Sequence, residues 1–388
     1  MTTPVGEWSS ELGEVVGRLE EEVTEARLCL GVQLFVSVEG ECLADVSLGE
    51  NGLGHPNRSD TLYALYCTTK PLTVLALGRF VDDGRVDVRA ELRSLLPGLS
   101  RRVGTITLWE LLTHTAGLHH HTGFEAGLLG PARREQLVTT LGPPPHWERG
   151  VHAGYSEYGA WHLLGRVVER LSGEEFRSHV RRSVLEPLGL EDSLFLGMTA
   201  EEFAANQARI GVNVDLRKLG RTPFLFERTE AQCTDYNPGV GGRGCARGLG
   251  RLYEHLVDVH RGRAPDPLVS PSLLHELTAV HRPPVPDVVL GRVCAFGLGF
   301  MVGLRAHGFG HYCSETAFGH SGYSGLSCGF ADPAYGLAVA ITYNGFLDVQ
   351  TSVLLRRQRI SNLIYKAIGV WAPVNKEFGS AARSDHAY

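Results

Sequence analysis

The sequence contains no apolar run as long as the roughly 18 residues that a membrane-spanning helix needs. Residues 1–28 are acidic and amphipathic, and they lack the basic segment followed by an apolar run that marks a secretory signal peptide. These absences predict a cytoplasmic protein that neither spans nor binds a membrane.

Basic patches, internal repeats and low-complexity tracts are also missing. The net charge is −6, and the arginines and lysines are scattered among acidic residues, so we expect no nucleic-acid partner. The eight cysteines show no repeated close spacing. They are therefore expected to be reduced thiols, most of which pack as small apolar side chains.

What is present is typical of a globular protein. Hydrophobic residues make up 43% of the chain and charged residues 21%, which argues against disorder. A chain of 388 residues is long enough for two lobes or one large domain with a sizeable core.

Strand-like sequence lies near both ends of the chain. Residues 29–50 have the pattern of two strands, and strands return from residue 294, with a hairpin turning at Asp332–Pro333. Helices are predicted over residues 12–27 and 351–368. The pattern predicts an α+β fold, in which one antiparallel sheet is flanked by the two terminal helices.

The middle of the chain is mostly helical. Thr107 and Glu110 predict a capping box on one short helix. Longer helices are predicted over residues 68–82, 157–171, 174–188 and 247–260. We expect residues 67–290 to form a mostly helical lobe, and residues 1–66 and 291–388 to form a sheet lobe. The seam between two such lobes is a usual place for a ligand cleft.

Residues 62–80, LYALYCTTKPLTVLALGRF, place a potential nucleophile at the start of a helix. Cys67 and Lys70 are three residues apart in the first turn, so their side chains lie on one face. The helix N-terminus and the lysine charge both favour the thiolate, which is the nucleophilic form of cysteine. The alternative is a small buried cysteine beside a surface lysine.

Two further segments carry candidate site residues. Tyr155 lies at a loop-to-helix junction, where a tyrosine can point into a cleft and transfer protons. Residues 317–325, AFGHSGYSG, place glycines around His320 and Ser321, so that backbone N–H groups can approach a ligand closely. A half-buried tyrosine and a glycine-rich turn with a solvent-exposed histidine are the alternatives.

Taken in order, these motifs resemble those of the serine β-lactamase and penicillin-binding-protein superfamily. The similarity is to the branch with class C β-lactamases, D-aminopeptidases, esterases and acyltransferases, and it covers roughly residues 28–370. That branch has Ser-x-x-Lys, Tyr-x-Asn and Lys- or His-x-Gly motifs. The corresponding segments here are Cys67-Thr-Thr-Lys70, Tyr155-Ser-Glu157 and His320-Ser-Gly322, and LLTHTAGL is a further landmark.

The resemblance implies an acyl-enzyme mechanism that needs no cofactor. Cys67 would be the nucleophile, Lys70 its activator and Tyr155 the general acid and base. The backbone N–H of Cys67 and one N–H after His320, itself a predicted catalytic residue, would hold the oxyanion. The substrate-binding residues would be Glu157, Ser321, Gly322 and Tyr323.

Two departures from the family pattern bear on the chemistry. Cys67 stands where the family has serine, so the intermediate would be a thioester, which amines attack more readily than water does. Glu157 stands where the family has asparagine. Its carboxylate would favour a protonated Lys70, or would bind or deprotonate an incoming amine. The alternative is a glutamate that turns outward and does neither.

The sequence thus predicts a cysteine-dependent acyltransferase or amide synthase. It would take an acyl group from an ester or thioester, such as an acyl-carrier-protein or coenzyme A conjugate, and pass it to a small-molecule amine or alcohol. Natural-product biosynthesis, such as that of an antibiotic, would suit this chemistry. A thioesterase or esterase, a binding protein without catalysis, and a cysteine engineered to trap an intermediate are the alternatives.

Two other groups of residues bear on metal binding and on substrate specificity. His119, His120 and His121 are consecutive and do not share one face, so we expect no metal site there or at His114. Specificity is expected to reside in residues 120–150 and 210–245. Five aromatic residues are expected either to line a ligand pocket or to belong to the core: Tyr63, Tyr66, Trp147, Phe224 and Tyr323.

Overall fold

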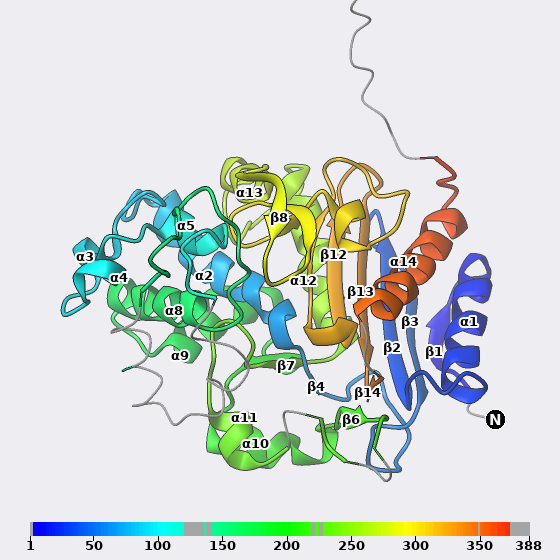
Figure 1. The fold of residues 1–388 in the computed structure, drawn as a ribbon. Coiled ribbons are helices and arrows are strands. Elements are labelled where there is room, and N and C mark those ends of the chain that lie inside the picture. The colour runs from blue at the N-terminus through cyan, green and yellow to red at the C-terminus, as the bar shows by residue number, and fades with distance from the viewer. Residues whose placement is uncertain are drawn as a thin grey trace, which may run out of the picture.

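The computed structural model describes residues 3–119, 136, 142–218, 222–224, 228–347 and 350–372. Its centre is an antiparallel sheet of nine strands in these described segments, in the order β1-β3-β2-β13-β12-β11-β10-β9-β8 (Figure 1). In that order the strands are Val5–Trp8, Glu41–Gly49, Gly31–Val38, Leu337–Tyr343, Ser327–Asp332, Phe318–Ser321, Met301–Val302, Arg292–Phe296 and Arg282–Asp287.

The two ends of the chain meet in the middle of this sheet. Strand β2 pairs with β13, with Val36 opposite Val339. Both strands are almost continuously apolar because helices cover both faces of the sheet. Helices α1 (Gly13–Thr24) and α14 (Gln350–Ala367) lie on one side and α12 (Ala246–His260) on the other (Figure 1). The α+β fold with terminal helices flanking one antiparallel sheet is confirmed.

Most of the remaining elements belong to the helical part of the chain. The helices are α2 (Lys70–Asp82), α3 (Leu92–Leu95), α4 (Arg101–Gly104), α5 (Leu108–Leu112), α8 (Gly159–Ser172), α9 (Phe176–Val180), α10 (Ala200–Asn206), α11 (Glu230–Thr234) and α13 (Pro271–Thr278). Helix α2 is buried along most of its length and packs against α8. Helix α5 begins with the predicted capping box of Thr107 and Glu110.

Two predicted helices have different bounds. The chain enters α2 through a 3₁₀ turn over Tyr66–Thr69, so the α-helix begins at Lys70. The helix predicted over residues 174–188 is α9 followed by a π turn over Arg181–Leu185 and a 3₁₀ turn over Glu186–Leu188. Pro187 has no N–H to continue an α-helical ladder, which explains why the helix changes form before it.

Short strands set the course of the chain before Cys67. Strands β4 (Tyr63–Ala64) and β5 (Leu194–Leu196) both pair with β7 (Gly242–Gly244), while β6 (Val214–Asp215) pairs with β14 (Gly345–Phe346). Since β4 directly precedes the turn that carries Cys67, this small sheet anchors the entry to the site.

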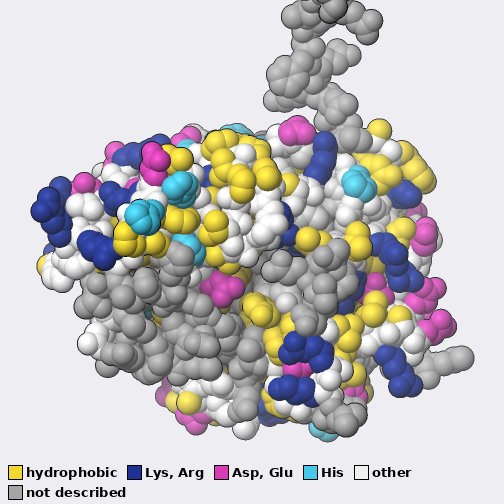
Figure 2. Space-filling model, viewed as in Figure 1, with side chains coloured by type: hydrophobic (Ala, Val, Ile, Leu, Met, Phe, Trp, Pro, Cys, Tyr) yellow, Lys and Arg dark blue, Asp and Glu magenta, His cyan; other side chains and the backbone are white. Residues whose placement is uncertain are grey.

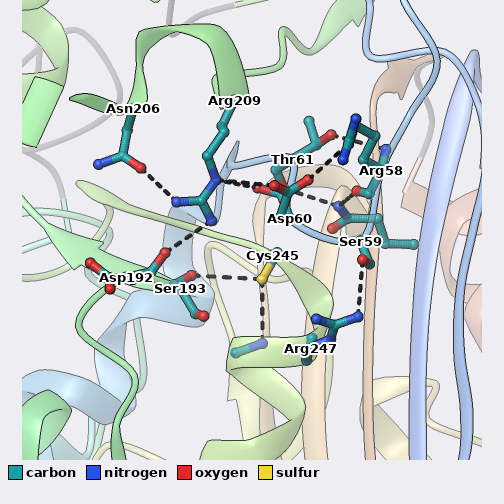
Figure 3. A network of polar contacts seen from close by, with 12 residues as sticks. Arg58, Ser59, Asp60, Thr61, Asp192, Ser193, Asn206, Arg209, Cys245 and Arg247 are labelled. Atoms are coloured by element: carbon teal, nitrogen blue, oxygen red, sulfur yellow. Dashed lines mark hydrogen bonds and ion pairs between the residues drawn. The ribbon is translucent and has the colours of Figure 1, made fainter. Parts of the chain in front are cut away.

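A polar network holds the loop ahead of β4 (Figure 3). Arg209 donates from Nε to the carbonyl of Asp60 (3.1 Å) and from Nη2 to the carbonyl of Asp192 (3.0 Å). Its Nη1 donates to the side-chain oxygen of Asn206. One arginine therefore ties together the loop before Cys67, the start of β5 and the end of α10.

Among the described helices, none combines the length and the apolar composition that crossing a membrane requires.

Candidate active site

Cys67 lies in the tight turn between β4 and α2. The preceding Tyr66 has φ = 51°, a left-handed conformation that non-glycine residues adopt only when their surroundings impose it. The turn is tied to the sheet, because Ser327 of β12 donates to the carbonyl of Leu65 (2.6 Å) and shares a hydrogen bond with Thr68 (2.6 Å). Backbone strain of this kind clusters at functional sites.

The Cys67 side chain is 6% exposed and lines a cavity of about 330 Å³. The cavity brings together predicted site residues that are distant in sequence. Those that line it are Cys67, Tyr155, Glu157, Ser321, Gly322 and Tyr323. Lys70 and His320 are not among the lining residues; both are fully buried behind it.

Lys70 is fully buried and makes its polar contacts with backbone carbonyls. Its Nζ donates to the main-chain carbonyls of Glu157 (3.1 Å) and Gly239 (3.0 Å) and lies about 5 Å from the ring centres of Tyr155 and Trp161. Burial lowers the pKa of Lys70, and the charges of Cys67 and Glu157 oppose that shift only in part. The side chain is therefore not a surface lysine.

Glu157 also contacts Lys70 through its backbone, because Lys70 Nζ donates to its main-chain carbonyl. The charge of its carboxylate favours the protonated lysine, although burial of Lys70 shifts the pKa of the lysine further in the opposite direction. The carboxylate itself is half-buried on the cavity wall. Burial raises the pKa of Glu157, and the charge of Lys70 opposes the rise. The alternative of a glutamate that turns outward does not fit a residue that lines the cavity.

Tyr155 packs against His114, with ring centres 4.3 Å apart. Its hydroxyl is buried and has no hydrogen-bond partner within the described chain. Burial, and then the nearby charge of Cys67, raise the pKa of Tyr155 well above its usual value. The hydroxyl therefore stays protonated at neutral pH and can donate a proton.

His114 supports this tyrosine. Its Nδ1 accepts a hydrogen bond from the N–H of Ser156 (3.0 Å), the residue after Tyr155. Burial lowers the pKa of His114 well below its usual value, so the ring is neutral and can accept at Nδ1. The motif containing His114 was recognised in the sequence, but its contact with Tyr155 was not.

His320 occupies β11 behind the cavity. Its Nδ1 lies 3.0 Å from the carbonyl of Ser321, and its ring centre is 6.1 Å from that of Tyr155. Burial and the charge of Lys70 lower the pKa of His320 well below its usual value. The structure thus places a neutral histidine behind Tyr155, where it supports the site.

Gly322 allows the chain after β11 to approach the turn that carries Cys67. A Cβ atom at this position would lie 2.2 Å from the Ser327 hydroxyl and 2.6 Å from the carbonyl of Leu65. Its N–H donates to the carbonyl of Ser327 (2.7 Å), so this amide is already engaged. The close approach to the Cys67 turn explains the need for glycine.

Asp287, which the sequence analysis missed, organises the rim of the cavity. One carboxylate oxygen accepts hydrogen bonds from the N–H groups of Tyr155 (3.1 Å), Val289 (3.0 Å) and Leu290 (3.0 Å). The other oxygen accepts from Arg282 Nη1 (2.9 Å), and the ion pair is buried. An arginine and an aspartate five residues apart in a proline-rich segment have no periodic pattern that would identify this role.

The hairpin held by Asp287 carries exposed apolar side chains. Val288 is 64% exposed and Val293 54%. Figure 2 shows hydrophobic side chains gathered over the β8 region on this face of the molecule. Val289 and Leu290, from the same hairpin, line the cavity.

The aromatic residues divide between cavity and core. Tyr323 lines the cavity together with Phe346, and Phe224 stacks on Phe346 at 3.8 Å between ring centres. Tyr66 lies behind Tyr323, at 6.1 Å. By contrast, the Tyr63 hydroxyl donates to Asn57 in the core.

The proposed specificity segments are only partly visible. Most of residues 120–150, including His120 and His121, lie outside the described residues, as do parts of 210–245. In the described part of the chain, no group of three His, Cys, Asp or Glu side chains is arranged to hold a metal ion.

An antiparallel sheet beside a helical lobe, with Cys67 and Lys70 at their junction, is the architecture of the β-lactamase fold. The family model described as Beta-lactamase matches residues 16–361, and the chain belongs to this family. A penicillin-binding protein homologue from Caulobacter crescentus shares the fold, with a TM-score of 0.76 and 23% identity, over 94% of this chain and all of that one.

Curated relatives of the chain include both hydrolases and transferases. The chain is 29% identical to esterase EstB of Burkholderia gladioli over 51% of its own length and 56% of the esterase. It is also 29% identical to ML-236A carboxylate methylbutanoyltransferase of Penicillium citrinum, over 36% of this chain and 39% of the transferase. The chain thus spans about half of the length of these relatives or less. Its family includes esterases and acyltransferases.

Proposed function

We propose that the protein is a cysteine-dependent acyltransferase that carries its acyl group as a thioester on Cys67. One observation carries the proposal: the Cys67 thiol lines a cavity, with a buried lysine below it and a protonated tyrosine beside it. A nucleophile, a proton acceptor and a proton donor are the groups that acyl transfer needs.

Acylation begins when the Cys67 thiol passes its proton to the free-amine form of Lys70, and the lowered pKa of Lys70 increases the fraction in that form at neutral pH. The sulfur then bonds to the carbonyl carbon of an ester or thioester. The bond to the leaving group breaks, and that group takes the Tyr155 proton. Lys70 returns its proton to the tyrosinate, so both residues regain their starting forms.

Transfer follows when an amine or alcohol attacks the thioester. The new bond forms to the acyl carbon, the carbon–sulfur bond breaks, and the proton lost by the acceptor restores the Cys67 thiol. The Glu157 carboxylate on the cavity wall can bind an ammonium group or take its proton. The backbone N–H of Cys67 and one from the segment after His320, other than that of Gly322, would hold the oxyanion.

Cysteine in place of serine favours transfer over hydrolysis. A thioester has less resonance stabilisation than an oxygen ester, and amines attack it in preference to water. The transferase relative supports an acyl-transfer role for this fold. The donor would be a small-molecule ester or a thioester of coenzyme A or an acyl-carrier protein, in natural-product biosynthesis.

The test is the intact mass of the protein after mixing with activated esters and thioesters, with Cys67→Ala alongside. We expect a mass increase that requires Cys67 and disappears faster after an amine is added than in buffer. Absence of an adduct with every donor, together with tight ligand binding, would contradict catalysis and favour a binding protein.

The second candidate is a thioesterase or esterase, which the EstB relative supports. In that case water is the acceptor, and the adduct clears at the same rate with or without an amine. The ratio of amide to free acid in the product therefore separates the two activities.

A further inference from the structure

Trp161 of helix α8 lies against the side-chain amine of Lys70. The Lys70 Nζ is 5.0 Å from the centre of the indole ring, a distance within the range of a cation–π contact. Helices α2 and α8, which carry the two residues, pack against each other (Figure 1). The ring of Tyr155 lies 5.1 Å from the same nitrogen, so two ring faces adjoin the amine.

The hydrogen bonds of this amine are to uncharged main-chain groups and to the Cys67 side chain. Nζ donates to the carbonyls of Glu157 and Gly239. Lys70 is fully buried, and a buried ammonium is costly unless nearby groups stabilise its charge. The two carbonyls and the two ring faces supply that stabilisation without carrying a net charge.

Packing fixes the indole ring in this position. Trp161 is itself fully buried. A Cβ atom at Gly239 would lie 2.8 Å from the Trp161 side chain, and a Cβ atom at Gly299 would lie 3.1 Å from it. Two segments that are distant in sequence therefore enclose the ring closely, which leaves it little freedom to move away from the Lys70 amine.

Packing alone does not explain why this residue is tryptophan. The indole N–H is buried and has no hydrogen-bond partner in the described part of the chain. A buried N–H group without a partner lowers stability, and phenylalanine would avoid that cost. Among the aromatic side chains, however, indole has the ring face that attracts a cation most strongly. The choice of ring therefore favours an electrostatic role.

The proposed acylation step needs a lysine that both takes up a proton and releases it. Such a group works best when its pKa lies near the working pH. A paired carboxylate would keep the lysine protonated, whereas burial without any stabilisation of the ammonium would make it too weak a base. A ring face has an effect between these two extremes, because it stabilises the ammonium only moderately.

We propose that Trp161 is a positioning residue whose ring face sets how strongly Lys70 holds its proton. The inference deepens the proposed function and rests on it, because that mechanism makes Lys70 the proton acceptor. Other titratable groups also face Lys70, and they come from several segments: Cys67, His114, Tyr155, Glu157 and His320. The experiments therefore change the indole and leave these groups in place.

The first experiment follows the titration of Lys70 directly by NMR, with lysine labelled with ¹³C at Cε. The sequence has only four lysines, and Lys70→Arg protein identifies the Lys70 signal by its loss. The measurement uses Cys67→Ala protein, so that no thiol titrates together with the amine. We expect Trp161→Phe in this background to lower the Lys70 pKa by about half a unit, because the weaker ring face stabilises the ammonium less.

The matched control is Trp109→Phe. Trp109 also has a cation over its ring, because the Arg89 guanidinium lies 4.2 Å from the ring centre. This variant removes an indole from a different contact and should leave the Lys70 pKa unchanged.

A second experiment keeps the size of the indole ring nearly constant. The protein contains five tryptophans, and growth on fluorinated tryptophan replaces all of them. Each added fluorine withdraws electron density from the ring face and weakens its attraction for a cation. We expect the Lys70 pKa to fall stepwise as the number of fluorines increases. In Trp161→Phe protein, which keeps the other tryptophans, the Lys70 pKa should not respond to fluorination.

The outcomes separate this inference from the proposed function. A Lys70 pKa that does not depend on fluorination, or that responds equally when residue 161 is phenylalanine, would overturn the inference. In protein that retains Cys67, the pH midpoint of acylation should move with the Lys70 pKa. If the pKa moves but no donor gives an adduct, the effect of Trp161 stands and the proposed function fails. If adducts form but the pKa does not move, the proposed function stands and the role of Trp161 fails.

Discussion

Burial changes the chemistry of Lys70 and Tyr155 in opposite directions. It removes water from both side chains, which lowers the pKa of the lysine and raises that of the tyrosine. At neutral pH a larger fraction of the lysine is therefore the free amine, which can accept a proton. The tyrosine keeps its proton and can donate it. These forms match the proposed acylation step.

The pH dependence of acylation follows from these shifts. The acylation rate should rise as Lys70 loses its proton, and this rise should come below the usual lysine pKa of 10.5 because the pKa is lowered. The rate should not fall again through ionisation of Tyr155 until well above pH 10. Single-turnover rates across pH test this, and Lys70→Arg should abolish the rising limb, because guanidinium does not titrate there.

Tyr155→Phe removes the proposed proton donor while keeping the ring against His114. We expect the acylation rate to fall about 10²-fold with donors that have poor leaving groups. Good leaving groups need little protonation as they depart, so the acylation rate with such donors should fall much less. An equal loss for both donors would contradict a proton-donor role.

Cys67→Ser tests what the sulfur contributes. The acyl group would then be an oxygen ester, which amines attack less readily, so the ratio of hydrolysis to amide formation should rise. Product analysis at fixed amine concentration measures this ratio. An unchanged ratio, with Cys67→Ala inactive, would show that the nucleophile does not set the choice of acceptor.

At the scale of elements, the β8–β9 hairpin and the segment carrying Tyr155 behave as one unit because both bind Asp287. The carboxylate accepts N–H groups from both and is neutralised by Arg282. Any change at Asp287 should therefore affect the cavity rim and Tyr155 together.

Asp287→Asn leaves the buried Arg282 charge unpaired. We expect it to lower the free energy of unfolding by about 3 kcal/mol, measured by urea denaturation. The matched control is Asp258→Asn, which breaks the exposed ion pair with Arg263 and should cost under about 1 kcal/mol. Similar losses in the two variants would show that Arg282 and Asp287 are not coupled as the geometry indicates.

Across the whole molecule, buried histidines link stability to pH. Burial lowers the pKa of His307 to about 3 and that of His114 and His320 well below the usual value of 6.5. Below pH 6.5 the unfolded chain therefore binds more protons than the folded one, so stability should fall as the pH falls from about 6.5 to 5.

In that range, each of these histidines lowers the free energy of unfolding by up to about 1.4 kcal/mol for every pH unit of acidification. Buried Glu22 and Asp332, whose pKa values are raised, oppose the trend in part. Urea midpoints at pH 5, 6 and 7 measure the net slope. A midpoint that is constant over this range would contradict the burial of neutral histidines.

The sequence alone determined the fold class and the order of the site motifs. Apolar periodicity and capping residues are local, and they marked β2, β3, β12, β13, α12 and the start of α5. The resemblance of three ordered motifs to a known family singled out Cys67, Tyr155 and Gly322 as candidate site residues.

Only the tertiary structure decided how the candidate site residues are charged and which others join them. The pKa shifts of Lys70 and Tyr155 come from burial by distant segments, and local sequence does not show burial. Asp287 carries no local pattern, since its role depends on which groups the folded chain brings beside its carboxylate.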